Sequence, residues 1–330
     1  MNVAVVMGGY SDESVISLKS GQLILDHLNK SKYEVFEIHI LLEGWFVVIE
    51  DKKYPINKAD FSFTNNKGVA VGFDVILNTV HGTPGEDGHL QAYWELLEIP
   101  YAGCNYYQSS LTFNKRDTLS VLTKFNIPRA KSIYVSEGNI DFTYEDVVKD
   151  LALPFFVKPN QSGSSLGISK VNSKEEFEKA LVFAFAEDKD ILIESFLDGV
   201  EISVGVLNYK GETKVLGLTE IVSHNAFFDY EAKYLGKSEE ITPARIDAEM
   251  TEKVKNIAVK VYESLRMTGF SRAEYIVMNN EPHFIEINTN PGLSPQSIFP
   301  QQAAYANISM SDLLDNEIEL ALQRKPIWKK

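Results

Sequence analysis

The stretch that decides the fold, residues 270–297, reads FSRAEYIVMNNEPHFIEINTNPGLSPQS. Strand-forming residues flank a polar turn at residues 279–282, and a Pro-Gly pair ends the second strand, so the stretch predicts a β-hairpin. Side chains alternate between the two faces of a strand. If the two strands pair, one face of the hairpin therefore gathers four polar residues: Arg272, Glu274, Glu286 and Asn288.

The oxygen atoms on this face are chemically suited to a metal ion. Two carboxylates and an amide oxygen are hard ligands, the kind that binds Mg²⁺ together with the phosphates of a substrate. A polar cluster on an apolar hairpin is costly to bury unless it is paired, which favours a functional site. The alternative is a hairpin whose polar face simply meets solvent, because single Glu and Asn residues are usually exposed.

Length and composition exclude several classes of protein. The chain of 330 residues is long enough for two or three domains, and its 44% hydrophobic residues are typical of a globular enzyme. A net charge of −14 argues against nucleic acid or an anionic membrane as a partner. The N-terminus lacks a signal peptide, and no apolar run approaches the ~20 residues of a membrane span. The single cysteine, Cys104, fits core packing in a reducing cytoplasm.

The N-terminal third follows a strand–turn–helix pattern. Residues 3–7 form an apolar run typical of a central parallel strand, and Gly8-Gly9 end it in a turn. Ser11 or Asp12 is expected to cap the helix that follows, with Glu13 in its first turn. This opening is Rossmann-like, so a ligand is expected at the carboxyl end of the strand.

A second strand at residues 74–80 ends in the loop HGTPGEDG at residues 81–88 and leads into a helix at 90–97. This loop also lies at the carboxyl end of a parallel strand, where ligands bind. His81 could serve a structural or a catalytic role, and the residues alone leave both open. The N-terminal domain is expected to close near residues 101–104.

The middle of the chain carries a candidate phosphate site. A helix is expected at residues 111–125 and contains Lys115, and Lys158 ends a strand ahead of the loop NQSGSSLG at residues 160–167. Backbone N–H groups and hydroxyls of such a loop can surround an anion while a lysine supplies charge. The alternative is a flexible hairpin tip.

Two features further along the chain also suggest a nucleotide site. Glu194 and Glu201 lie on or next to the following strands, where they could accept hydrogen bonds from a ribose and an adenine amine or equally face solvent. Residues 224–243 form a polar segment too long for an ordinary connection, which favours a functional lid carrying Lys233 and Tyr234. A helix is expected at residues 247–265 and a closing one at 311–322.

These motifs, taken in order, resemble the ATP-grasp superfamily and within it the D-alanine–D-alanine ligase family. The resemblance spans nearly the whole chain, from Gly8-Gly9 and the loop at 81–88 to the hairpin and Ser297. It implies an α/β, ATP-grasp fold in three domains. Residues 1–104 would form a Rossmann-like substrate domain, 105–193 a central subdomain with the glycine/serine loop, and 194–330 a C-terminal subdomain with the lid and the metal hairpin.

The resemblance also implies a reaction and its residues. Two D-alanines would be joined through an acyl phosphate at the expense of ATP, for peptidoglycan precursor synthesis. Two Mg²⁺ (or Mn²⁺) ions would be held by Glu274, Glu286 and Asn288. The residues binding ATP would be Lys115, Lys158, Ser164, Ser165, Glu194, Glu201 and Lys233. Substrates would be bound by Glu13, His81 and Ser297, and catalysis would involve Glu13, Ser164, Lys233, Tyr234, Arg272 and Gly292.

This chain departs from the family pattern in three places. Glu274 stands where the family usually has Asp, the hairpin turn is one residue shorter, and Thr83-Pro84 replace a commonly basic residue. We expect retuned metal geometry rather than lost activity, and a less certain anchor for the substrate carboxylate. Alternatives are a non-catalytic ATP-binding protein with a degenerate site, or a ligase that uses D-lactate as second substrate. The family also implies a cytoplasmic homodimer.

Overall fold

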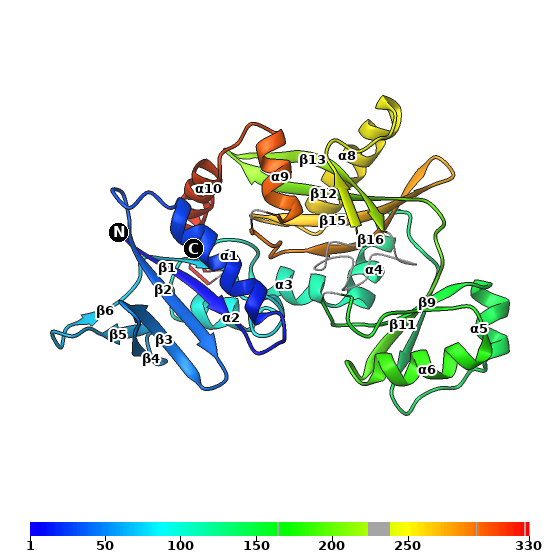
Figure 1. Ribbon diagram of the computed structural model, residues 1–330, viewed down its shortest axis with the longest axis horizontal. Helices are drawn as coiled ribbons and strands as arrows, with labels where there is room; N and C mark the ends of the chain where they lie inside the picture. The colour runs from blue at the N-terminus through cyan, green and yellow to red at the C-terminus, as the bar shows by residue number, and fades with distance from the viewer. Residues whose placement is uncertain (164, 224–237, 295, 327, 330) are drawn as a thin grey trace.

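The computed structural model describes residues 1–163, 165–223, 238–294, 296–326 and 328–329. Its described residues form three sheets that follow one another along the chain, with seven, four and five strands. Figure 1 shows the N-terminal sheet in blue, the small central sheet in green with α5 (Tyr144–Leu151) and α6 (Lys174–Phe185) against it, and the C-terminal sheet between them above. The domain boundaries at 104 and 193 remain predictions.

The N-terminal sheet is built around the predicted apolar strand. In spatial order its strands are β6 (Ala70–Val71), β5 (Ser62–Thr64), β4 (Lys52–Asn57), β3 (Gly44–Ile49), β2 (Glu34–Leu41), β1 (Asn2–Gly8) and β7 (Val75–Asn78). β1 pairs in parallel with both β2 and β7. Val3, Val5 and Met7 pack in a cluster that includes residues of α1 (Ser14–His27) and α10 (Met310–Gln323). Ala4 and Val6 pack in the cluster that includes Trp94 of α2 (His89–Leu96). The expectation of a strand covered on both faces is confirmed.

Two sequence-based expectations for the helices are wrong in detail. Helix α1 has Glu13 as its N-cap, whereas Ser11 donates its hydroxyl hydrogen bond to the carbonyl of His81. The single helix expected at residues 111–125 is two helices, α3 (Tyr106–Phe113) and α4 (Lys115–Thr123). Asn114 separates them because its side chain accepts the Asp117 N–H, which satisfies an unpaired donor at the start of α4.

The central sheet positions the glycine/serine loop. Its strands in order are β10 (Ser169–Val171), β9 (Phe155–Pro159), β11 (Asp190–Ser195) and β8 (Ser132–Ser136), all antiparallel. Helices α5 (Tyr144–Leu151) and α6 (Lys174–Phe185) lie close to the positions expected from their apolar stripes. Val147 of α5 and Phe177 of α6 are among the buried residues in the core of this sheet.

The C-terminal sheet carries the hairpin that organised the sequence. Its strands in order are β14 (Ser238–Ile241), β13 (Glu212–Ser223), β12 (Val200–Tyr209), β15 (Ser271–Met278) and β16 (Glu281–Asn288). Helix α8 (Ala248–Ser264) contributes to the same core, which also contains Leu119 and Leu122 of α4. Helix α9 (Ile298–Tyr305), absent from the sequence-based expectations, contacts β12 and β13.

Two further expectations change in this part of the chain. The predicted lid at 224–243 is not all loop, because Ser238–Ile241 pair with β13 as β14. Residues 224–237 lie outside the described residues, so the rest of that expectation is not addressed. The hairpin turn is tighter than residues 279–282, since only Asn279 and Asn280, both with positive φ, separate the strands. Among the described residues, no helix has the length and apolar character needed to cross a membrane.

Candidate active site

Two cavities have one glutamate in common among their lining residues. The polar cavity, about 290 Å³, is lined by residues of α1, the loop at 81–88, α4, the hairpin and the loop at 289–297. The inter-sheet cavity, about 440 Å³, lies between the central and C-terminal sheets. Glu286 lines both. A group transferred from a ligand in one cavity to a ligand in the other would pass this carboxylate.

The hairpin holds its four polar residues in the predicted register. Arg272 pairs with Asn288 and Glu274 pairs with Glu286 across the two strands. A guanidinium nitrogen of Arg272 lies 2.9 Å from a carboxylate oxygen of Glu274, which is only 4% exposed. The expectation that these residues share a face is confirmed. None of the four is exposed, so the alternative of a polar face that simply meets solvent is wrong.

A β-bulge follows Glu274 in the hairpin. The register shifts between Glu274 and Tyr275, which leaves Ile285 as the extra residue on β16. Bulged residues can place two neighbouring side chains on the same side of a strand. Ile285 and Glu286 accordingly both line the inter-sheet cavity, while Phe284 is buried in the core. The bulge thus supplies one apolar and one charged group to the same cavity.

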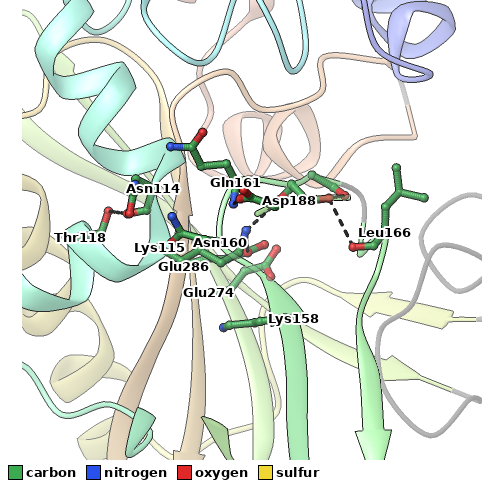
Figure 2. A network of polar contacts seen from close by, with 12 residues as sticks. Asn114, Lys115, Thr118, Lys158, Asn160, Gln161, Leu166, Asp188, Glu274 and Glu286 are labelled. Atoms are coloured by element: carbon green, nitrogen blue, oxygen red, sulfur yellow. Dashed lines mark hydrogen bonds and ion pairs between the residues drawn. The ribbon is translucent and has the colours of Figure 1, made fainter. Parts of the chain in front are cut away.

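Lys115 joins the central part of the chain to the hairpin. It is the first residue of α4, and its backbone N–H donates to the carbonyl of Asn160. Its ammonium donates to the carbonyl of Ser162 at 2.8 Å and lies 3.8 Å from Glu286. The break at Asn114 is therefore what places this lysine at a helix start beside the glycine/serine loop. Figure 2 shows Lys115 and Glu286 pointing toward each other.

Lys158 reaches the inter-sheet cavity from β9. It is buried, and its ammonium lies 2.5 Å from a carboxylate oxygen of Glu194 on β11. Figure 2 shows Lys158 drawn below Glu274. Lys158, Glu194 and Glu274 all line the inter-sheet cavity. Glu194 is thus buried, so the alternative in which its side chain faces solvent is wrong. Glu201 also lines the cavity.

Glu13 and the glycine/serine loop approach each other closely. A Cβ built on Gly163 would lie 2.7 and 2.8 Å from the two carboxylate oxygens of Glu13. A side chain at this position would require the Glu13 carboxylate or the loop to shift. Glu13 and His81 are both buried and both line the polar cavity. Ser164, Lys233 and Tyr234, which the sequence also assigned to this site, lie outside the described residues.

The loop after β16 closes the other side of the polar cavity. Gly292 and Ser297 line it, and the hydroxyls of Ser294 and Ser297 lie 2.8 Å apart. The loop is fixed to the N-terminal part of the chain by two hydrogen bonds, from Asn290 to the carbonyl of Val80 and from the Leu293 N–H to Ser20.

Ser165, in the glycine/serine loop, lines the inter-sheet cavity and has a positive φ of +59°.

Burial shifts the titration of three groups around the polar cavity. It raises the pKa of Glu86 to about 8, with repulsion from Glu13 as a further cause. It lowers the pKa of His81 to about 4, with Arg272 adding to the effect, so the imidazole is neutral at pH 7. It also raises the pKa of Glu240, a shift that Arg272 opposes. The cavity is therefore less negative at neutral pH than its carboxylates alone would indicate.

The sequence-based reasoning missed several residues that line these cavities. In the polar cavity they include Lys19, Glu86, Glu240 and Gln296, and in the inter-sheet cavity Phe156, Phe196 and Ile276. Lys19 follows Glu13 and Ile16 at three-residue spacing, a helical signal that was available. Glu240 lies on β14, a strand that was not expected.

Comparisons with known proteins agree along the whole chain. A family model described as D-ala D-ala ligase N-terminus matches residues 2–104, and one described as D-ala D-ala ligase C-terminus matches 121–319. The chain is 73% identical to the D-alanine–D-alanine ligase of Flavobacterium psychrophilum, over 100% of both chains.

Solved structures of similar fold cover nearly all of the chain. The VanG D-Ala:D-Ser ligase from Enterococcus faecalis matches with a TM-score of 0.86 and 30% identity, over 97% of this chain and 99% of that one. The D-alanine–D-alanine ligase from Bacillus anthracis, in complex with ATP, matches with a TM-score of 0.78 and 29% identity, over 98% of each chain.

Proposed function

Because the chain belongs to the D-alanine–D-alanine ligase family, we propose that its two cavities hold the two reactants of one phosphoryl transfer. The protein is an ATP-dependent ligase that joins two D-alanines, and ATP is its nucleotide substrate. We assign ATP to the inter-sheet cavity and D-alanine to the polar cavity. The observation that carries this assignment is Glu286, which lines both cavities and lies beside Lys115.

The donor atoms of the hairpin fit a divalent cation. Glu274, Glu286 and Asn288 offer two carboxylates and an amide oxygen at neighbouring registers, the hard ligands that Mg²⁺ or Mn²⁺ takes. Among the described residues, no group of three or more His, Cys, Asp and Glu side chains is placed to hold a metal. We therefore propose that phosphate oxygens of ATP complete the coordination of two ions at these three residues. The bound ions would neutralise charge on the phosphates.

The remaining residues have roles set by their charge and position. Lys158 would bind the phosphates in the inter-sheet cavity, and Lys115 would bind them from the polar cavity, beside Glu286. Ser165 of the glycine/serine loop would also contact the phosphates, with Glu194 and Glu201 toward the adenosine. Neutralisation of the phosphate charge by the lysines and the bound ions would favour attack by the carboxylate of the first D-alanine. Phosphoryl transfer depends mainly on such positioning and electrostatics. That step forms a bond from the carboxylate oxygen to the γ-phosphorus, breaks the bond from the γ-phosphorus to the β–γ bridging oxygen, and gives an acyl phosphate and ADP.

Peptide bond formation would take place in the polar cavity. The amine of the second D-alanine attacks the acyl phosphate, and we assign the oxyanion to Arg272 and the N–H of Gly292. Glu13 would bind the ammonium of the first D-alanine beside His81, and Ser297 the carboxylate of the second. Ser164, Lys233 and Tyr234 keep the roles that the family resemblance implies, although they lie outside the described residues. From the same resemblance we propose a homodimer that acts in the cytoplasm.

The direct test is phosphate release from ATP and Mg²⁺, with D-alanine, L-alanine, D-alanine plus D-lactate, or D-alanine plus D-serine supplied in turn. We expect release that depends on D-alanine, with D-alanyl-D-alanine as the main product. A depsipeptide or D-alanyl-D-serine as the main product would change the assignment of the second substrate. ATP binding without release under any mixture would contradict the catalytic assignment.

A further inference from the structure

Two buried carboxyl groups and a buried imidazole occupy one end of the polar cavity. Glu13 comes from the start of α1, while His81 and Glu86 come from the loop that follows β7. Their exposed fractions are 9%, 5% and 8%, respectively. The Gly82 N–H donates to Glu86 at 2.6 Å, which fixes that carboxyl group within the loop.

The charges around the cavity suit an amino-acid zwitterion. Cationic groups come from Arg272 on β15, Lys115 on α4 and Lys19 on α1. On the proposed function, on which this inference rests, the carboxylate of the first D-alanine points toward the phosphates beyond Glu286. Its ammonium group then lies at the end occupied by Glu13 and Glu86.

In the absence of a bound cation, the surroundings of Glu86 favour the protonated form of its carboxyl group. Burial is the main cause of its raised pKa of about 8, and repulsion from Glu13 on α1 and Asp87 on the same loop adds to it. The Gly82 N–H and Arg272 on β15 act in the opposite direction. His81 is neutral at pH 7, so it supplies no compensating positive charge. At pH 7 the protonated form of the Glu86 carboxyl group is therefore favoured over the ionised form.

We propose that Glu86 is the second carboxylate of the ammonium site and that it releases a proton when the first D-alanine binds. An ammonium group placed beside two carboxyl groups favours the ionised form of both, because it offsets their mutual repulsion and the cost of burying charge. The O–H bond of Glu86 breaks, its proton passes to the buffer, and the ammonium keeps all of its N–H bonds. Glu86 thus acts as a binding residue as well as a brace for its loop.

Calorimetry can count the proton. D-alanine is titrated into the protein with Mg²⁺ and a non-hydrolysable ATP analogue, in two buffers of different ionisation enthalpy, at pH 7.0 and again at pH 8.5. We expect the wild type to release more protons than Glu86→Gln at pH 7.0, and we expect this difference to be smaller at pH 8.5. Glutamine keeps an oxygen that accepts the Gly82 N–H, so the brace survives and only the titrating group is lost. We also expect a rise of about tenfold or more in KM for D-alanine.

Glu317→Gln is the matched control. Glu317 is also buried and has a pKa raised by burial to about 8, but it lies on α10 and does not line the polar cavity. We expect this variant to release as many protons as the wild type. Two results would overturn the proposal: equal release by the wild type and Glu86→Gln, or no release by a wild type that binds D-alanine at pH 7.0. The second needs no variant, so poor folding of Glu86→Gln would not prevent the test. A protein that neither binds D-alanine nor releases phosphate with it would contradict the proposed function instead.

Discussion

Glu274 meets two demands at one position of β15. Its carboxylate contacts Arg272 at 2.9 Å, and the same residue lines the inter-sheet cavity opposite Glu286. A carboxylate has about four lone-pair sites, so it can accept from a guanidinium and still ligate a cation. This is why we regard the exchange of Asp for Glu as compatible with activity.

Substitution of Glu274 separates charge from length. Glu274→Asp keeps the charge and shortens the side chain by one methylene, so we expect kcat within about tenfold of wild type and a changed Mg²⁺ concentration for half-maximal rate. Glu274→Gln removes the negative charge that faces both Arg272 and the metal. We expect kcat to fall by about 10²-fold or more. Steady-state rates over a Mg²⁺ titration measure both. Equal rates in the wild type and Glu274→Gln would show that the carboxylate is not a ligand.

Individual site residues were predictable where a local rule placed them. Alternation along two strands was enough to bring Arg272, Glu274, Glu286 and Asn288 to one face. Glu86 lies in the loop at 81–88 that the sequence placed at a ligand-binding strand end, but no role was assigned to it, and Glu240 was not identified. The proximity of both to the other residues depends on how three sheets pack. The roles of the identified residues stay proposals.

At the scale of elements, the approach of the glycine/serine loop to α1 defines the shape of the polar cavity. Gly163 lies against the carboxylate of Glu13, which is the N-cap of that helix. The helix start therefore determines where the loop can lie. Any side chain at residue 163 must displace either the loop or Glu13.

Gly163→Ala tests this contact. The added methyl would meet the Glu13 oxygens at less than 3 Å, so we expect kcat/KM for D-alanine to fall by about 10²-fold, because a small displacement of a positioning group is enough for such a loss. Thermal unfolding should shift little, since the loop lies outside the sheets. Gly72→Ala is the control: it has no atom within 4 Å of the added carbon and should leave kcat/KM unchanged. Full activity of Gly163→Ala would remove the contact from our account.

Elements were predictable where their apolar pattern was continuous and less so where a single polar residue divided them. The pattern at residues 111–125 indicated one helix, and the side-chain cap at Asn114 made two. That break could have been read from the helix-capping preference of Asn. The pairing of β14 with β13 depends on a partner distant in sequence, so local pattern could not identify it.

At the scale of the whole molecule, two buried acids with raised pKa affect how stability depends on pH. Glu86 and Glu317 are both buried and both have a pKa of about 8, against 4.5 for an ordinary glutamate. Between those two pH values the folded chain binds more protons than the unfolded chain. The free energy of unfolding therefore decreases as pH rises from about 4.5 to 8, and it is unaffected by these groups below that range.

Glu317→Gln should remove part of this dependence. The variant carries no ionisable group at that position, so we expect its Tm to match the wild type near pH 4.5 and to exceed it increasingly up to pH 8. Thermal unfolding at pH 4.5, 6, 7 and 8 measures the difference. Glu319→Gln, on the exposed face of the same helix, is the control and should show no such trend. A Tm difference that is constant with pH would contradict the assignment.

The α/β, ATP-grasp architecture and the family were both predicted from the sequence and are confirmed by the comparisons. That prediction depended on the order of the motifs, which extend along the chain from Gly8-Gly9 to Ser297. Motif order cannot show how two cavities meet at one side chain, because that depends on the packing of sheets from separate parts of the chain. The position of Glu286 between the cavities is the central claim that the structure adds.

The most direct test of that claim is D-alanine-dependent phosphate release by Glu286→Gln at saturating ATP and Mg²⁺, with ATP binding and thermal unfolding measured on the same sample. Glutamine keeps the size of the side chain but loses its charge. We predict a loss of at least about 10²–10³-fold in release, with the fold and ATP binding retained. Release at a rate close to that of the wild type would contradict the assignment of Glu286 to the metal and to the junction of the two cavities.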